Sequence, residues 1–156
     1  MAKAKITSVA QTDKAGLFSI CFDGESFDEF QKFIINHKDA YSEDLNTILV
    51  VLQRMLEASG FLERYFRPEG KMRDGVCALP LQSGKLRLYC LRLSDSVLIA
   101  GNGGVKSTKT YNQDPVLSGY VVTLQNLDQA IKFAVKKGDV KIEERSITNL
   151  EKNYDL

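Results

Sequence analysis

The sequence predicts an α+β fold: N-terminal strands, a helical hairpin packed on an antiparallel sheet, and a C-terminal helix. Three observations lead to it. Short apolar runs with the period of a strand occupy the N-terminal and central parts of the chain, two stretches of helical period lie between them, and a third helical stretch follows. The chain has 156 residues, 44% of them apolar, which fits one domain. We expect that domain to span residues 1–138, with residues 139–156 as a polar C-terminal extension.

The first elements predicted are a β-hairpin and a helical hairpin. Residues 5–10 and 17–22 are partly alternating runs around a turn, as in paired strands. The motif Ser26-Phe-Asp-Glu29 has the spacing of a capping box and predicts that a helix begins there. A second helix should begin near Ser42, because apolar residues recur at three- and four-residue steps until Gly60 offers a stop. The connection between these helices is short, so we expect them to be antiparallel.

The sheet is predicted in the middle of the chain, after a charged loop. Its strands are separated by connections that are short enough only for hairpins, which makes this part of the sheet antiparallel. We place the loop at residues 61–74 and the strands at residues 76–81, 86–93 and 97–100.

The last helix is marked at both ends. Asp114 suits the N-cap position and Pro115 the first helical position, while Gly138 follows the last apolar repeat. Residues 120–124 are rich enough in β-branched side chains for a strand to compete with the helix. A further short strand is possible at residues 140–144.

Charge is divided unevenly along the chain. The 21 basic and 20 acidic residues give a net charge of +1, which by itself argues against a nucleic-acid partner. Residues 64–111, however, hold 9 basic and 3 acidic residues, a net charge of +6. Such a block predicts a local patch that binds RNA, with binding that weakens as salt rises. No apolar stretch reaches the roughly 18 residues of a membrane helix, so we expect a cytoplasmic protein without membrane contact.

The three cysteines do not predict a metal site. Cys21, Cys77 and Cys90 lie in apolar runs, form no closely spaced pair, and are accompanied by a single histidine, His37. This pattern predicts buried thiols. We expect neither a metal nor a cofactor.

Two basic segments are candidates for chemistry. Alternation along the central strand places Lys85, Arg87 and Tyr89 on the face opposite to the apolar residues, where they could contact a phosphate backbone and a base. The alternative is an ordinary solvated sheet face. Downstream, the glycine-rich run 101–104 predicts a flexible strand exit that brings Lys106, Lys109 and Tyr111 together, and here the alternative is a polar turn. No nucleotide-binding glycine motif is present.

Five short motifs lie in the two predicted helices, the entry to the sheet, its central strand and the segment after the last strand. They are Phe27-Asp-Glu-Phe30, Val51 to Gly60, Lys71-Met-Arg-Asp-Gly75, Lys85-Leu-Arg-Leu-Tyr89 and Gly104-Val-Lys-Ser-Thr-Lys109. Together with the order of elements, these stretches resemble the RelE/HigB-like toxins of type II toxin–antitoxin systems. The resemblance covers about residues 17–137.

This resemblance implies an endoribonuclease that cleaves ribosome-bound mRNA without a metal, by attack of a ribose 2′-OH on the adjacent phosphate. Arg87 would bind the scissile phosphate, Lys106 or Lys109 would supply charge or a base, and Tyr111 or Tyr89 would stack on a base or relay a proton. The implied partners are mRNA, the ribosome and a cognate antitoxin, expected to be a helix-turn-helix protein. The residues expected to contact RNA, with Arg73 as a second phosphate clamp, are Arg67, Lys71, Arg73, Lys85 and Tyr89.

Two other functions stay open at this point. The predicted strand at residues 76–81 is apolar where these toxins commonly carry a basic residue, and Ser107 interrupts the pair of lysines after the last strand. The chain could therefore be a non-catalytic protein of the same fold that binds an antitoxin or RNA. A gyrase-directed toxin of the related ParE type is the other alternative.

Overall fold

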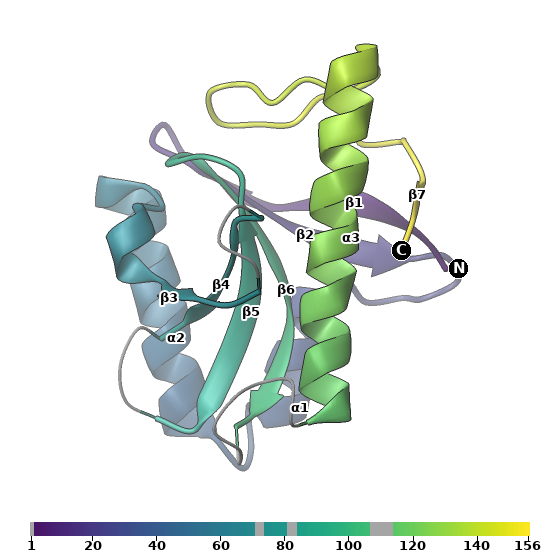
Figure 1. The fold of residues 1–156 in the computed structure, drawn as a ribbon. Coiled ribbons are helices and arrows are strands. Elements are labelled where there is room, and N and C mark those ends of the chain that lie inside the picture. The colour runs from purple at the N-terminus through teal and green to yellow at the C-terminus, as the bar shows by residue number, and fades with distance from the viewer. Residues whose placement is uncertain (1, 71–73, 81–83, 107–113) are drawn as a thin grey trace.

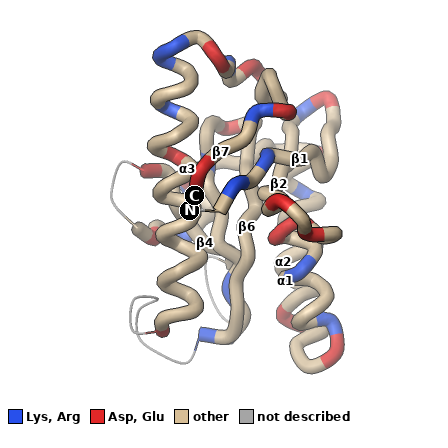
Figure 2. The backbone as a smooth tube through the Cα atoms, turned by 90° about the vertical axis from the view of Figure 1, so that its right-hand side faces the viewer, with Lys and Arg blue, Asp and Glu red and all other residues tan. Residues whose placement is uncertain are grey.

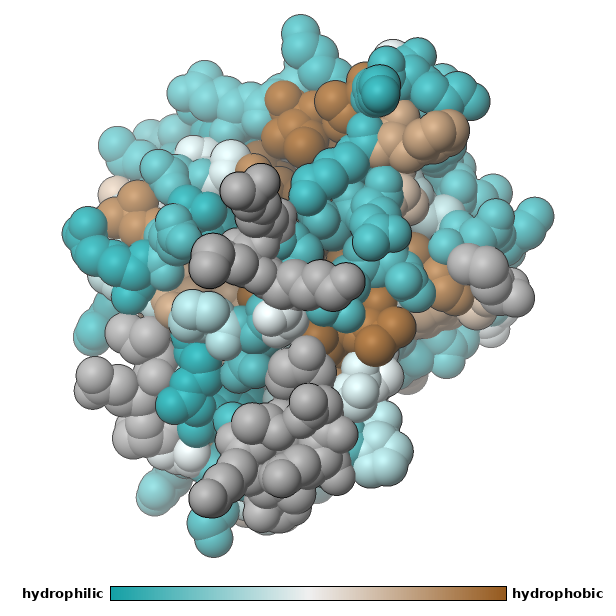
Figure 3. Space-filling model, in the orientation of Figure 1, coloured by the Kyte–Doolittle hydropathy of each residue, from teal (hydrophilic) through white to brown (hydrophobic). Residues whose placement is uncertain are grey.

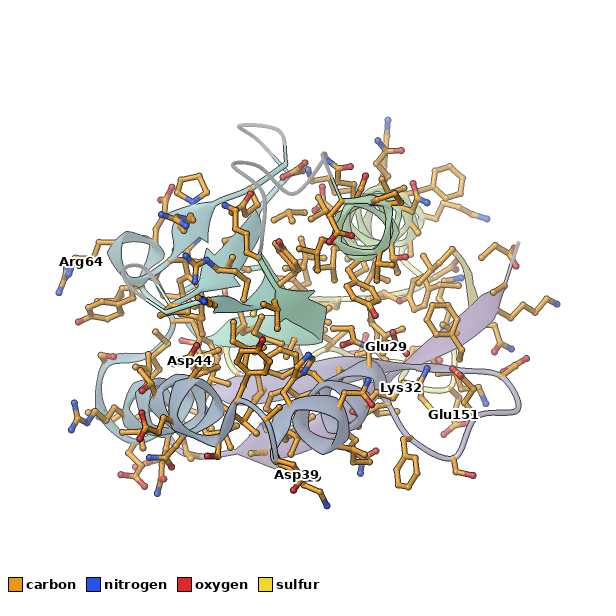
Figure 4. All side chains as sticks on the ribbon, turned by 90° about the horizontal axis from the view of Figure 1, so that it is seen from below. Glu29, Lys32, Asp39, Asp44, Arg64 and Glu151 are labelled. Atoms are coloured by element: carbon orange, nitrogen blue, oxygen red, sulfur yellow. The ribbon has the colours of Figure 1, made fainter. Side chains whose placement is uncertain are left out.

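The computed structural model describes residues 2–70, 74–80, 84–106 and 114–156, and these form three layers. A sheet lies in the middle, helices α1 (Glu29–His37) and α2 (Ser42–Arg54) cover one face, and helix α3 (Pro115–Lys137) covers the other (Figures 1 and 4). The predicted α+β class is confirmed. In the described part of the chain no helix is long and apolar enough to cross a membrane.

The sheet is mixed rather than wholly antiparallel. Its strands within the described residues follow the order β3-β4-β5-β6-β2-β1-β7. Strands β2 and β6 run parallel, with Leu17 opposite Leu98, and the other neighbours are antiparallel. The strands are β1 (Lys3–Gln11), β2 (Gly16–Phe22), β3 (Arg67–Pro68), β4 (Val76–Leu79), β5 (Leu86–Arg92), β6 (Val97–Val105) and β7 (Tyr154–Asp155).

The N-cap of α1 lies two residues later than predicted. Asp28, not Ser26, is the N-cap residue: its carboxylate accepts from the backbone N–H of Gln31 at 2.8 Å, and the Gln31 side chain accepts from the Asp28 N–H at 2.9 Å. The capping box is therefore built by Asp and Gln, and Phe27 lies exposed before the helix.

The second helix confirms the predicted hairpin. Residues 38–41 join α1 to α2, and Figure 4 shows both helices end-on beneath the sheet. A wider π-turn, Met55–Ser59, continues α2, and Gly60 ends it at φ +74°, donating its N–H to Met55 O. Gly60 therefore provides the expected stop.

Two segments predicted as loops are strand instead. Arg67 and Pro68 form β3, which pairs with β4, and the glycine-rich run 101–104 lies inside β6 and is buried. Glycine is required there for packing, because a Cβ on Gly103 would lie only 1.9 Å from the carbonyl oxygen of Arg87 on β5. A Cβ on Gly104 would lie 2.9 Å from Leu117 of α3. The prediction of a flexible strand exit at residues 101–104 is thus wrong.

The C-terminal segment forms the helix that was predicted, followed by a tail that joins the core. Asp114 caps α3, accepting from Val116 N at 2.9 Å, and Gly138 ends it in the left-handed conformation. The tail was expected to be a polar extension, but Val140, Ile147 and Tyr154 are buried against the α3 side of the sheet. Strand β7 also pairs with β1, so the tail contributes the edge strand of the sheet.

Burial on both faces of the sheet decides what its strands present to solvent. Along β5, Leu88 and Cys90 pack toward α1 and α2, as alternation predicts, while Tyr89 and Leu91 pack toward α3. Arg87 is the first residue of β5 on the α3 face, ahead of Tyr89 and Leu91. The candidate site lies at that end.

Candidate active site

Three cations and one carboxylate gather at the start of β5 on the α3 side of the sheet. Arg67 lies opposite Ala78 in the β3–β4 pair, and Ala78 lies opposite Tyr89, so Arg67 shares the face of Arg87. Lys106 follows β6 and donates its N–H to Lys85 O at 2.7 Å, which continues the β5–β6 ladder. We refer to Arg67, Glu69, Arg87 and Lys106 as the sheet-end site.

Glu69 is the member of this site that the sequence analysis missed. It follows β3, and its N–H donates to Val76 O at 3.1 Å, so its side chain lies on the face of Val76 and of α3. Burial raises the pKa of the Glu69 carboxyl, and Lys106, Arg67 and Arg87 each act in the opposite direction. The result is a carboxylate that is more basic than usual and has three positive charges around it.

The residue that follows Glu69 is fixed by contacts with Asp74 and with Gln125 of α3. This residue, Gly70, has φ +66°, and the space where a Cβ would be is occupied by Asp74 and Gln125, both 2.9 Å away. Asp74 accepts from Val76 N at 3.0 Å and from the Gln125 side chain of α3 at 3.1 Å. Glu69 also lines a groove of about 180 Å³ along the β3–β4 edge, a groove that Arg67, Arg87 and Lys106 do not line.

Arg87 occupies the centre of the site but is largely enclosed. Only 7% of the residue is exposed, and its Nη1 donates to the carbonyl oxygens of Gly84 at 2.9 Å and Leu86 at 3.1 Å. Burial lowers the pKa of the guanidinium, and the neighbouring Arg67 lowers it further. Because arginine does not deprotonate in proteins, Arg87 supplies a fixed positive charge to the site.

Helix α2 fixes the beginning of β5 from the other face. The Asp44 carboxylate accepts from the backbone N–H groups of Lys85 at 3.0 Å and Leu86 at 3.3 Å, and in Figure 4 this side chain lies between α2 and the sheet. The same charge acts on Arg87. Asp44 therefore positions the strand end that carries Arg87, although nothing in its sequence context marks it.

The structure separates the other sequence-predicted site residues into three groups. Lys85 is exposed at the start of β5, as expected. Tyr89 is fully buried in the core under α3, so the expectation that it faces solvent and can stack on a base is wrong. The cause is that α3 folds back over that face of β5. Lys71, Arg73, Lys109 and Tyr111 lie outside the described residues.

The sheet-end site combines a carboxylate of raised pKa with three cations. A carboxylate of raised pKa can accept a proton, and fixed cations can stabilise negative charge that develops on phosphorus. Within the described ranges no cluster of three or more metal-ligating side chains occurs. Comparisons of the chain with family models, with curated proteins and with solved structures found no match.

Proposed function

We propose that the protein is a RelE/HigB-like toxin that cleaves ribosome-bound mRNA at the sheet-end site. The order of elements supports this proposal: strands, a helical hairpin, the antiparallel run β4 to β6 and a closing helix follow one another as the sequence resemblance implies. The basic block at residues 64–111 also contains every member of the site.

The observation that carries the proposal is Glu69 among Arg67, Arg87 and Lys106. In the reaction, the Glu69 carboxylate removes the proton from a ribose 2′-OH, and the 2′-oxygen attacks the adjacent phosphorus. The bond from phosphorus to the 5′-oxygen breaks, and the Lys106 ammonium gives that oxygen its proton. The products are a 2′,3′-cyclic phosphate and a 5′-hydroxyl, and no electrons are exchanged.

The cations act on the transition state. Negative charge accumulates on the phosphorus oxygens as the attacking bond forms, and Arg67 and Arg87 lie on the same face of the sheet to meet it. A charge fixed by hydrogen bonds, as at Arg87, needs no reorganisation at the moment of reaction. Lys85, exposed beside them, would contact the RNA backbone.

A second candidate is binding to RNA or to an antitoxin without turnover. The enclosure of Arg87 favours it, because Nη1 of the guanidinium already donates to the backbone carbonyls of Gly84 and Leu86 at the start of β5. Arg87 would then stabilise the strand end, and the neighbouring cations would serve binding alone.

Induced expression in bacteria separates these candidates. For the nuclease we expect growth arrest and mRNA fragments ending in a 2′,3′-cyclic phosphate, and we expect both to disappear in Glu69→Gln. Glu63→Gln is the matched control, since Glu63 is an exposed carboxylate on the same segment. Co-sedimentation with ribosomes without any fragments would favour the binding protein. DNA damage without mRNA cleavage would indicate the gyrase-directed alternative.

A further inference from the structure

The charged residues on the solvent-facing side of α3 are confined to its last turns, where Lys132, Lys136 and Lys137 are exposed. In the described structure the exposed positions from Pro115 to Ala130 are all uncharged, and Val116 and Val122 are 61% and 44% exposed. Further along, Phe133 is 64% exposed. Figure 3, which views the α3 side, shows separate brown apolar patches on a largely teal, hydrophilic surface. An outer helix face is normally its most charged side, so this one resembles a covered surface.

The side chains on this face are spaced for contact with another helix. Pro115, Gly119, Val122, Asn126, Gln129 and Phe133 follow one another at alternating steps of four and three residues, the spacing of a helix–helix seam. We call these six residues the α3 seam. Its two ends are unlike: Phe133 projects, whereas a Cβ on Gly119 would have no atom within 4 Å.

The ends of α3 also carry opposite charges. Asp114 lies at the start of the helix, and Lys136 and Lys137 lie at its end, with Asp139 4.0 Å from the Lys137 ammonium. The helix dipole, positive at the start and negative at the end, offsets part of this difference. In Figure 2 the first turns of α3 after its red start are tan, and both red and blue segments follow toward its end. A second α3 in antiparallel orientation would bring each acidic end to a basic end.

We propose that the α3 seam binds the α3 seam of a second copy of this chain, antiparallel, about a two-fold axis near Asn126. Asn126 is the central residue of the helix, so the two copies overlap along its whole length. Phe133 of one copy then meets the turn from Pro115 to Gly119 of the other, where the missing Cβ leaves room. Asp114 meets Lys136 and Lys137 at both ends.

The dimer is expected to be weak and reversible. A helix of 23 residues is about 34 Å long, and one such pair buries an area at the low end for specific interfaces, below about 1,200 Å². The sheet-end site lies on the sheet and not on the outer face of α3, so this inference does not depend on the proposed function.

Sedimentation velocity over a range of protein concentrations tests the dimer. We expect the 17.5 kDa chain to shift toward twice its mass as concentration rises. Asn126→Asp places two like charges beside the axis and should raise the dissociation constant at least about tenfold, as should Phe133→Ser. Asn46→Asp is the matched control, because Asn46 is an exposed asparagine on α2.

Two results would overturn the proposal. One is a wild-type chain that stays monomeric at every concentration up to the millimolar range. The other is a dimer that Asn126→Asp and Phe133→Ser leave as tight as the wild type, because that dimer would use another face. Circular dichroism of each variant checks that the fold is retained.

Discussion

Replacing Gly103 by alanine tests how closely β5 and β6 must approach to form the site. The added Cβ would lie 1.9 Å from Arg87 O and 3.0 Å from the Leu88 Cα, so β6 must move away by more than an ångström. That movement disrupts the pairing of Leu88 with Gly103 and of Arg87 with Gly104. Overpacking costs about 1–3 kcal/mol and two weakened ladder bonds cost about 1–3 kcal/mol, so we expect a loss of about 2–6 kcal/mol.

Guanidinium unfolding at low micromolar protein concentration measures this loss, and the fall in melting temperature should be roughly 2–4 °C per kcal/mol for a domain of this size. Gly119→Ala is the control with the opposite expectation. It adds a Cβ in open space within a helix and should stabilise the protein by about 0.5–1 kcal/mol. A Gly103→Ala variant as stable as the wild type would refute the close approach of the strands.

Two further substitutions test single contacts. Asp44→Ala removes the acceptor of two backbone N–H groups at the start of β5 and should cost about 1–3 kcal/mol in chemical unfolding, against less than about 1 kcal/mol for exposed Glu43→Ala. Equal losses would contradict that role. Burial raises the pKa of Asp128, so the folded state binds its proton more tightly and stability should fall as pH rises through that pKa. Asp128→Asn should lack this fall. Its unfolding free energy relative to that of the wild type should therefore increase as pH rises from about 4 through the raised pKa of Asp128, and a difference that does not change with pH would disprove the reasoning.

Local signals in the sequence predicted most of the elements. Asp114 followed by Pro115 marks the start of α3, and the helical period that follows outweighed the β-branched residues at positions 120–124. The short connections between β4, β5 and β6 likewise fixed an antiparallel order. These features depend on neighbours in the chain, which sequence patterns record directly.

The errors concern contacts between distant segments. The parallel pairing of β2 with β6 joins residues about 80 positions apart, and no local pattern encodes it. Tyr89 was expected on a solvated face because alternation separates two faces but does not say whether a later helix covers one of them. The glycine run of β6 was interpreted as a loop. In the structure glycine is needed there because Arg87 O of β5 and Leu117 of α3 lie where a Cβ would be.

The candidate site was predicted only in part, for the same reason. Arg87 and Lys106 belong to motifs that the sequence shows, and the structure places both on the side of the sheet that carries Glu69. Glu69 itself lies in a segment interpreted as a loop, and its raised pKa arises from burial that only the folded chain provides. Nothing in the neighbouring sequence distinguishes a future proton acceptor from any other charged residue of a loop.

Cleavage of mRNA on programmed ribosomes by the purified protein tests the central claim most directly. We predict fragments with 2′,3′-cyclic phosphate ends, formed at a rate that rises with pH as Glu69 loses its proton. Glu69→Gln should slow cleavage by about 100-fold or more, since general-base catalysis contributes about 10²–10⁴. The same variant should be at least as stable as the wild type at neutral pH, because it removes a half-buried charge whose pKa is raised by folding. Equal cleavage by wild type and Glu69→Gln, or none by a folded wild type bound to ribosomes, would contradict the account.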